Sequence, residues 1–126
     1  MPSYDRQQFK PPAAVARVIV RDRNGARSVS DVAMLVDSGA DVTLIPANCL
    51  DRLALRSEPE EGYLLRGFAG GTGAAKAVDA EIEFLGLVFH GRFLVIDQDW
   101  GVLGRNVLNH VSLLLDGPRL TWRVVP

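Results

Sequence analysis

Apolar and polar residues alternate in short runs along most of this chain, and turn-forming residues separate the runs. Residues 15–21 and 28–36 are two such runs, and the segment between them contains Asn24 and Gly25. Asn-Gly between two alternating runs is a strong signal for a β-hairpin, because both residues tolerate the left-handed backbone of a tight turn. A hairpin is therefore predicted near the start of the chain.

The middle of the chain repeats this pattern with a longer strand. Residues 63–66 lead into a glycine-rich stretch at 67–73, and an alternating run at 75–84 follows it. Four glycines in seven residues leave backbone amides open to a ligand, so we expect a hairpin with a glycine-rich tip. Residues 58–62, Glu-Pro-Glu-Glu-Gly, are expected to form an acidic surface loop before this hairpin.

Further short strands and one clear helix are expected in the rest of the chain. The expected elements are a strand pair in residues 87–97 around His90 and Gly91, a short strand at 101–103, a helix that starts in 104–110, and a final hairpin of 111–115 with 119–125. Before these, Pro46 suits the first position of a short helical turn that ends near Leu53. The pattern as a whole predicts a mainly β fold.

One apolar run ends in a carboxylate. Residues 32–36 are typical of a strand that is buried on both faces, and Asp37, Ser38 and Gly39 follow them directly. A carboxylate at the end of such a strand loses hydration, which costs free energy unless a partner compensates. This placement indicates a catalytic role for Asp37, whereas Asp-Ser-Gly by itself more often forms a simple turn.

Composition restricts the domain organisation and the partners. The 126 residues are 48% hydrophobic, which is enough for one core and too little for two ordinary domains. Fourteen Lys and Arg and fifteen Asp and Glu are scattered along the chain, so we expect no binding to nucleic acid or to a membrane surface. The single Cys49 and two histidines offer no internal disulfide and no zinc spacing, so we expect no metal and no cofactor.

Residues 1–13 are expected to form an extended or mobile N-terminal arm, because Pro11 and Pro12 lack backbone donors, and residues 14–126 to form the single domain. The arm is polar, and no run in the chain approaches the roughly 18 apolar residues that a membrane span needs. A cytoplasmic protein is expected. The sequence leaves open whether the arm is removed by self-cleavage and whether the chain is a piece of a longer protein.

Three segments carry a family resemblance through their order and spacing. They are 35–41 (Leu-Val-Asp-Ser-Gly-Ala-Asp), the glycine-rich 67–73, and 102–108 (Val-Leu-Gly-Arg-Asn-Val-Leu). These resemble the active-site loop, the flap and the Gly-Arg-Asp/Asn signature of the retropepsins, a family of dimeric aspartic proteases. The resemblance implies a retropepsin-like half-barrel of β-strands, with one short helix in the C-terminal region and a flap hairpin.

The resemblance also implies an aspartic endopeptidase that hydrolyses extended peptides. Because the chain has one Asp-Ser-Gly, the active form is implied to be a homodimer with Asp37 as the catalytic residue of each subunit. One carboxylate activates water while the other, protonated, polarises the scissile carbonyl. Two carboxylates so close together share one proton, so a bell-shaped dependence of activity on pH is expected.

Other residues receive supporting roles from the same resemblance. The implied active-site support comprises Ser38, Gly39, Ala40, Asp41 and Arg105, and the implied substrate-binding flap comprises Phe68, Ala69, Gly70, Gly71, Thr72 and Gly73. Ser38 is implied to bond across the two-fold axis, and Asp41 to form an ion pair with Arg105 that costs about 3–5 kcal/mol to break. The residues expected among those of the substrate pockets are Ala33, Val42, Ile45, Val95 and Leu103.

The same residues allow other interpretations. A catalytically weak or inactive retropepsin-like module, which dimerises and binds peptides, remains open. A phosphate loop at 67–73 lacks the Gly-Lys-Ser/Thr ending, and a triad of Ser38 with His90 or His110 lacks Gly-x-Ser-x-Gly. Trp100 and Trp122 are expected to pack at the core edge or at an interface, and Cys49 to be a packing residue. The substrate and the cleavage preference do not follow from the sequence.

Overall fold

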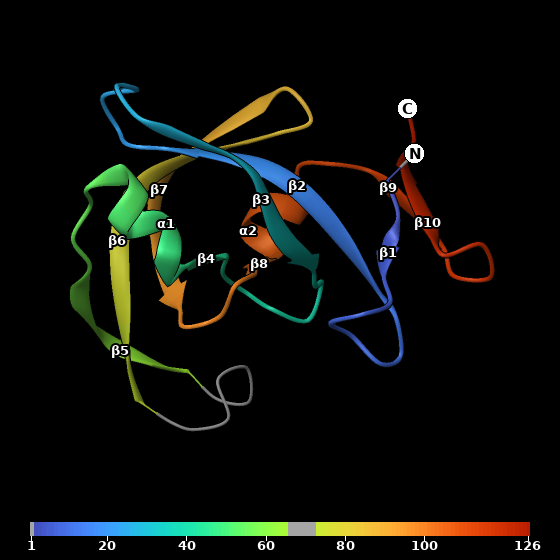
Figure 1. The fold of residues 1–126 in the computed structure, drawn as a ribbon, viewed down its shortest axis with the longest axis horizontal. Coiled ribbons are helices and arrows are strands. Elements are labelled where there is room, and N and C mark those ends of the chain that lie inside the picture. Colours follow the sequence, from blue (N-terminus) through green and yellow to red (C-terminus); the bar gives the residue numbers. More distant parts are fainter. Residues whose placement is uncertain (1, 66–72) are drawn as a thin grey trace.

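The computed structural model describes residues 2–65 and 73–126 (Figure 1). The strands are β1 (Tyr4–Asp5), β2 (Ala13–Arg21), β3 (Ser28–Val36), β4 (Leu44–Pro46), β5 (Glu58–Leu65), β6 (Gly73–Phe84), β7 (Leu87–Ile96), β8 (Gly101–Leu103), β9 (Leu113–Asp116) and β10 (Thr121–Val124). The helices are α1 (Ala47–Leu53) and α2 (Arg105–Leu108). Strands dominate, which confirms the predicted mainly β class.

Among the described residues, one curved sheet accounts for most of the strands. Its order is β1-β2-β3-β8-β4-β7-β6-β5, and the end of β2 pairs additionally with β6. Because β2 contacts both β3 and β6, the sheet curls back on itself and encloses the core, as a half-barrel does. β9 and β10 form a separate antiparallel hairpin, as expected from the sequence.

The first predicted hairpin is confirmed in detail. β2 and β3 pair antiparallel, with Val15 opposite Leu35. In the turn, Gly25 has a φ of +70° and donates its N–H to the Asp22 carbonyl at 3.0 Å. The left-handed backbone at this position is the reason that Asn-Gly was a reliable signal.

Two predicted elements of the sheet are wrong. Residues 58–62 are not a loop but the start of β5, where Glu58 lies opposite Ala77 of β6. Residues 87–97 are not two strands, because β7 runs unbroken and Gly91 lies opposite Ala80 of β6. The actual turn falls earlier, between β6 and β7, at residues 85 and 86, which both have positive φ.

The helices also differ from expectation. Pro46 is the N-cap residue of α1 with an extended ψ of 137°, one position before the place expected for it. α2 spans four residues, whereas α1 spans seven, so the helix after residue 104 is not the one clear helix. Gly104 precedes α2 in an extended conformation, which delays the helix start to Arg105.

The two chain ends lie side by side at the β9–β10 hairpin (Figure 1). Ser3 forms an isolated antiparallel bridge with Thr121, and the N–H of Tyr4 donates to the Leu120 carbonyl at 2.9 Å. Trp122 is 3% exposed, and its indole N–H donates to the Val15 carbonyl at 3.0 Å. These contacts attach the final hairpin to the main sheet. Trp122 packs where this hairpin meets the core, in agreement with the core-edge position expected for it.

Two groups of buried side chains form the core. The larger group includes Met34, Ile82 and Phe84, which are each at most 2% exposed. Burying each such side chain stabilises the fold by about 1.5–3 kcal/mol. The smaller group, which we call the second cluster, comprises Leu44, Ala75, Ala77, Leu94, Ile96 and Val102. Leu35 and Ala40, on either side of Asp37 in the sequence, pack against it.

Candidate active site

Asp37 stands where two parallel strands end together. β3 and β8 pair in parallel, with Val36 opposite Leu103, and Asp37 follows Val36 directly. The N–H of Asp37 donates to the Leu103 carbonyl at 3.1 Å, so the strand pairing continues to the carboxylate itself. The end of β8 leads into Gly104 and α2, and the first and third sequence motifs are therefore neighbours in space.

The burial of β3 is less complete than the sequence predicts. Val32 and Met34 are buried, but Ala33, Leu35 and Val36 are half-buried in the single chain. Asp37 is also half-buried, whereas Ser38 and Gly39 are exposed. The Asp37 side chain therefore lies close to the surface of the chain.

A tight turn holds the carboxylate. The N–H of Gly39 donates to Oδ1 of Asp37 at 2.9 Å, and the N–H of Ala40 donates to the Asp37 carbonyl at 3.1 Å. A Cβ atom at position 39 would lie 3.1 Å from the same Oδ1, which is tighter than ordinary packing. Glycine at this position lets the backbone approach the carboxylate, and a charge-assisted hydrogen bond orients the acid.

Arg105 braces the turn through backbone atoms rather than through Asp41. Its guanidinium donates to the Ser38 carbonyl at 2.9 Å, and its N–H donates to the Ala40 carbonyl at 2.8 Å. Among the described residues, no ion pair joins Arg105 to Asp41, and both side chains are exposed. Within the chain, the expected ion pair is thus replaced by hydrogen bonds to neutral carbonyl groups.

Thr43 makes a second link that the sequence motifs did not reveal. Thr43 is fully buried, and its hydroxyl donates to Oδ1 of Asn106 at 2.7 Å. The hydroxyl oxygen of Thr43 also accepts the N–H of Gly104 at 3.0 Å. A Cβ atom at Gly104 would overlap the Val42 carbonyl, so only glycine allows this approach. The one signal in the sequence was the hydroxyl of Thr43 between the apolar residues Val42 and Leu44, because a buried hydroxyl needs a hydrogen-bond partner.

A group of half-buried apolar residues, which we call the apolar surface, includes Leu35 and Ala40 on either side of Asp37 in the sequence. Leu35, Ala40, Val42 and Trp100 are half-buried and pack against the second cluster. Of the residues expected in the substrate pockets, Ile45 and Leu103 are wrong, because they are at most 1% exposed in the main core. Val42 belongs to the apolar surface. Trp100 is half-buried and packs against the second cluster, which agrees with the position at the core edge expected for it.

Of the six residues expected in the flap, only Gly73 is among those that the structure describes. Phe68, Ala69, Gly70, Gly71 and Thr72 lie outside the described residues. Gly73 is the first residue of β6, and β5 ends at Leu65. The strands on both sides of the glycine-rich stretch pair with each other, with Leu65 opposite Gly73.

Comparison with known proteins identifies the family. A sequence model described as "gag-polyprotein putative aspartyl protease" matches residues 24–110, which is more than half of the chain. The chain belongs to this aspartyl protease family. The matched range contains Asp37 and Arg105, so the family assignment covers the turn described above.

The fold of this aspartyl protease family member agrees with a solved retropepsin. EIAV protease, in a complex with the inhibitor HBY-793, is similar with a TM-score of 0.58 and 24% sequence identity, over 78% of this chain and 86% of that chain. At this level of identity the likeness shows a common fold. No match was found among curated proteins.

The histidines and the cysteine of this family member contact neighbouring side chains or are buried among them. Nδ1 of His90 lies 3.0 Å from Oε1 of Glu81, and the His110 ring packs 5.7 Å from that of Phe89. Cys49 is 2% exposed, and burial raises the pKa of its thiol above the ordinary 9.0, partly opposed by Arg52. A neutral, buried thiol is consistent with the packing role expected from the sequence.

In residues 2–65 and 73–126, no helix has the length and apolar composition to cross a membrane. The same residues contain no group of three or more His, Cys, Asp or Glu side chains placed to hold a metal ion.

Proposed function

We propose that this chain is an aspartic endopeptidase, active as a homodimer in which each subunit contributes Asp37. The observation that carries the proposal is a half-buried carboxylate, oriented by the N–H of Gly39, at the paired ends of β3 and β8 in a retropepsin fold. The sequence contains a single Asp-Ser-Gly, so a second acid has to come from a second chain.

The proposed mechanism uses the two carboxylates in different protonation states. One Asp37 takes a proton from a water molecule as that water attacks the scissile carbonyl, and the protonated Asp37 of the partner donates a hydrogen bond to the carbonyl oxygen. The Gly39 N–H holds each carboxylate in position before reaction. The tetrahedral intermediate then collapses as a proton passes to the leaving amine.

The exposed edge of the final hairpin supports the proposed homodimer. β9 pairs with β10 on one side, and its other edge has no strand partner among the described residues. Leu115 is 53% exposed, and Leu114 and Val124 are 37% and 47% exposed. An open strand edge with apolar side chains favours pairing with another strand. β9 follows α2 along the chain, and Arg105 of α2 bonds to the Asp37 turn.

The glycine-rich stretch from Phe68 to Gly73 is proposed to cover the bound peptide. Its amides would bond to the backbone of an extended substrate and exclude water during the reaction. The apolar surface formed by Leu35, Ala40, Val42 and Trp100 would bind substrate side chains on the opposite side. The proposed substrate is therefore an extended peptide with apolar residues near the scissile bond.

The decisive experiment combines Asp37→Asn with a peptide-library digest and sedimentation from about pH 4 to pH 8. We expect the wild type to be a dimer that cleaves peptides with a bell-shaped pH profile. Asp37→Asn should remain a folded dimer and lose several orders of magnitude in kcat, because the shared acid-base pair is gone. Asp51→Asn, at an exposed position of α1, is the matched control and should behave as wild type.

The other outcomes are equally informative. Equal turnover by Asp37→Asn would contradict the catalytic role, and a monomer that still cleaves would contradict the two-chain site. A wild-type dimer that binds peptides without cleaving them would identify the chain as a retropepsin-like binding module instead.

A further inference from the structure

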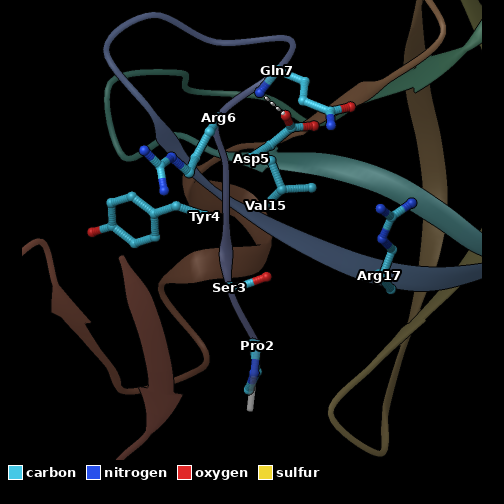
Figure 2. A pocket seen from close by; sticks show the side chains of 8 residues that line it. All are labelled: Pro2, Ser3, Tyr4, Asp5, Arg6, Gln7, Val15 and Arg17. Carbon is cyan, nitrogen blue, oxygen red and sulfur yellow. Dashed lines mark hydrogen bonds between the residues drawn. The ribbon is translucent and has the colours of Figure 1, made fainter. Parts of the chain in front are cut away.

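The N-terminal arm is folded against the body of the protein. β1 pairs with the start of β2, and the chain then reverses, because the N–H groups of Gln7 and Gln8 donate to Oδ1 of Asp5 at 2.8 and 2.9 Å. Figure 2 shows the first of these bonds at the start of the turn. Residues 6–12 therefore form a loop whose two ends are both held by strands.

An aromatic contact fastens this loop to the body. The rings of Phe9 and Trp100 meet edge to face, with centroids 4.9 Å apart and an interplanar angle of 63°. Two cavities lie along the arm. One, of about 510 Å³, is lined by residues 2–7 with Val15 and Arg17 (Figure 2), and the lining of another, of about 190 Å³, includes Gln8 and Asp99.

Trp100 links this contact to the apolar surface beside Asp37. Its ring packs against the second cluster together with Leu35 and Val42. Trp100 lies immediately before β8, and the three residues to Leu103, whose carbonyl bonds to Asp37, correspond to ~10 Å of strand. An extended peptide advances by about 3.3 Å per residue, so Trp100 is within reach of a substrate side chain two or three residues from the scissile bond.

We propose that the N-terminal arm is part of the substrate-binding cleft, where Phe9 orients Trp100 to receive a bulky apolar side chain of the peptide. Trp100 contacts the substrate, and Phe9 is a positioning residue that acts through the Trp100 ring. Phe9 lies outside the family match at 24–110, so the match by itself assigns it no role. The inference rests on the proposed endopeptidase function, and it makes residues 1–13 necessary for selectivity.

The edge-to-face geometry explains why a ring is needed at position 9. The edge of one ring is attracted to the face of the other, and a pair of this kind has a preferred orientation that aliphatic contacts lack. Loss of Phe9 leaves Trp100 free to change rotamer, so the wall of the cleft is no longer preorganised for the substrate. Chemistry at Asp37, at the far end of β8, should not change.

The experiment uses the full chain with the peptide library and one fluorogenic peptide selected from it. For Phe9→Ala we expect roughly a two- to tenfold rise in KM, the range of one aromatic pair, with kcat changed less than about twofold. The preference for a bulky apolar residue should flatten at one library position. Phe9→Tyr should restore wild-type values, and Leu87→Ala, an exposed apolar truncation on β7, is the matched control.

A double-mutant cycle tests whether Phe9 acts through Trp100. Phe9→Ala should add nothing to the KM or the library profile of Trp100→Ala. The same peptides are also titrated into Asp37→Asn with and without Phe9→Ala, which measures binding without cleavage. If Phe9→Ala does not fold, Phe9→Leu, which keeps apolar volume and removes the ring, takes its place.

The outcomes separate this inference from the proposed function. An unchanged KM and library profile for Phe9→Ala, additive effects with Trp100→Ala, or the same change in Leu87→Ala would each overturn the role of Phe9. A uniform loss of kcat on all peptides would also overturn it, because that result indicates a purely structural role. Failure of the proposed function instead appears as absent cleavage by the wild type or full cleavage by Asp37→Asn. Absence of peptide binding by all variants would overturn both.

Discussion

Replacing Thr43 with valine should loosen the connection between the Asp37 turn and α2. Valine has nearly the same shape as threonine, so the substitution removes the hydroxyl and leaves the packing in place. The hydroxyl donates to Asn106 and accepts the N–H of Gly104, at 2.7 and 3.0 Å. Thr43 and Gly104 are buried, whereas Asn106 is exposed. The two lost hydrogen bonds therefore have different consequences.

The expected loss of stability follows from this difference. The buried N–H of Gly104 is left without a partner, which costs about 1–3 kcal/mol. The exposed Asn106 regains water, so its bond contributes only about 0.5–1.5 kcal/mol. We expect Thr43→Val to lower the free energy of unfolding by about 2–3 kcal/mol. Thr43→Ser keeps the hydroxyl and loses one buried methyl group, which costs about 1 kcal/mol.

Urea unfolding at a fixed protein concentration measures both variants, because the stability of a dimer depends on concentration. Thr43→Val should also have a lower kcat than Thr43→Ser, since the turn that carries Asp37 is less well held. The reasoning is refuted if Thr43→Val lies within about 0.5 kcal/mol of wild type, or if Thr43→Ser is as unstable as Thr43→Val.

Two further substitutions test the bracing and the dimer surface. Arg105→Ala should lower stability by about 1 kcal/mol in urea unfolding, because the exposed guanidinium bonds to a neutral carbonyl; a loss above about 3 kcal/mol would instead indicate an ion pair with Asp41. Leu115→Asp should raise the dimer dissociation constant in sedimentation by roughly tenfold or more, because like charges would meet at the β9 edge. Leu87→Asp is the matched control, because Leu87 is also an exposed leucine but lies on β7. An unchanged dissociation constant for Leu115→Asp would place the dimer interface elsewhere.

The β2–β3 hairpin, the final hairpin and the Asp37 turn were predictable because local signals coincide with the fold. Gly25 needs a left-handed backbone, and Asp37 with Gly39 forms a turn whose hydrogen bonds are local. The family match extends from one motif to the other, and Arg105 does contact the Asp37 turn. Residue order therefore carried enough information to locate these features.

Other elements depend on partners that are distant in the sequence. β5 begins with Glu58 and Pro59, which indicate a loop, but the strand is at the sheet edge, where charged residues and proline are tolerated. A guanidinium nitrogen (Nη2) of Arg92, on β7, also lies 3.2 Å from Oε2 of Glu58. Gly91 appeared to end a strand, yet its pairing with β6 continues unbroken. No local pattern reveals such long-range pairing.

The atoms that Arg105 and Thr43 bond to could not be inferred from the sequence, because several of them belong to the backbone of distant residues. The family resemblance implies an ion pair between Asp41 and Arg105, but both side chains are exposed, so solvation competes with pairing. Thr43 is buried between segments more than 60 positions apart, and one of its partners is a backbone amide. Backbone partners leave no trace in the side-chain pattern.

The indole of Trp122 has a consequence for how two subunits would meet. Because its N–H bonds to β2 and its ring lies 6.1 Å from that of Phe84, the last hairpin moves with the barrel as one body. Two copies that join along β9 would then bring their acids together at a separation determined by rigid geometry. Little conformational freedom would be lost on association, and small changes at the root of the hairpin would be transmitted directly to the distance between the two carboxylates.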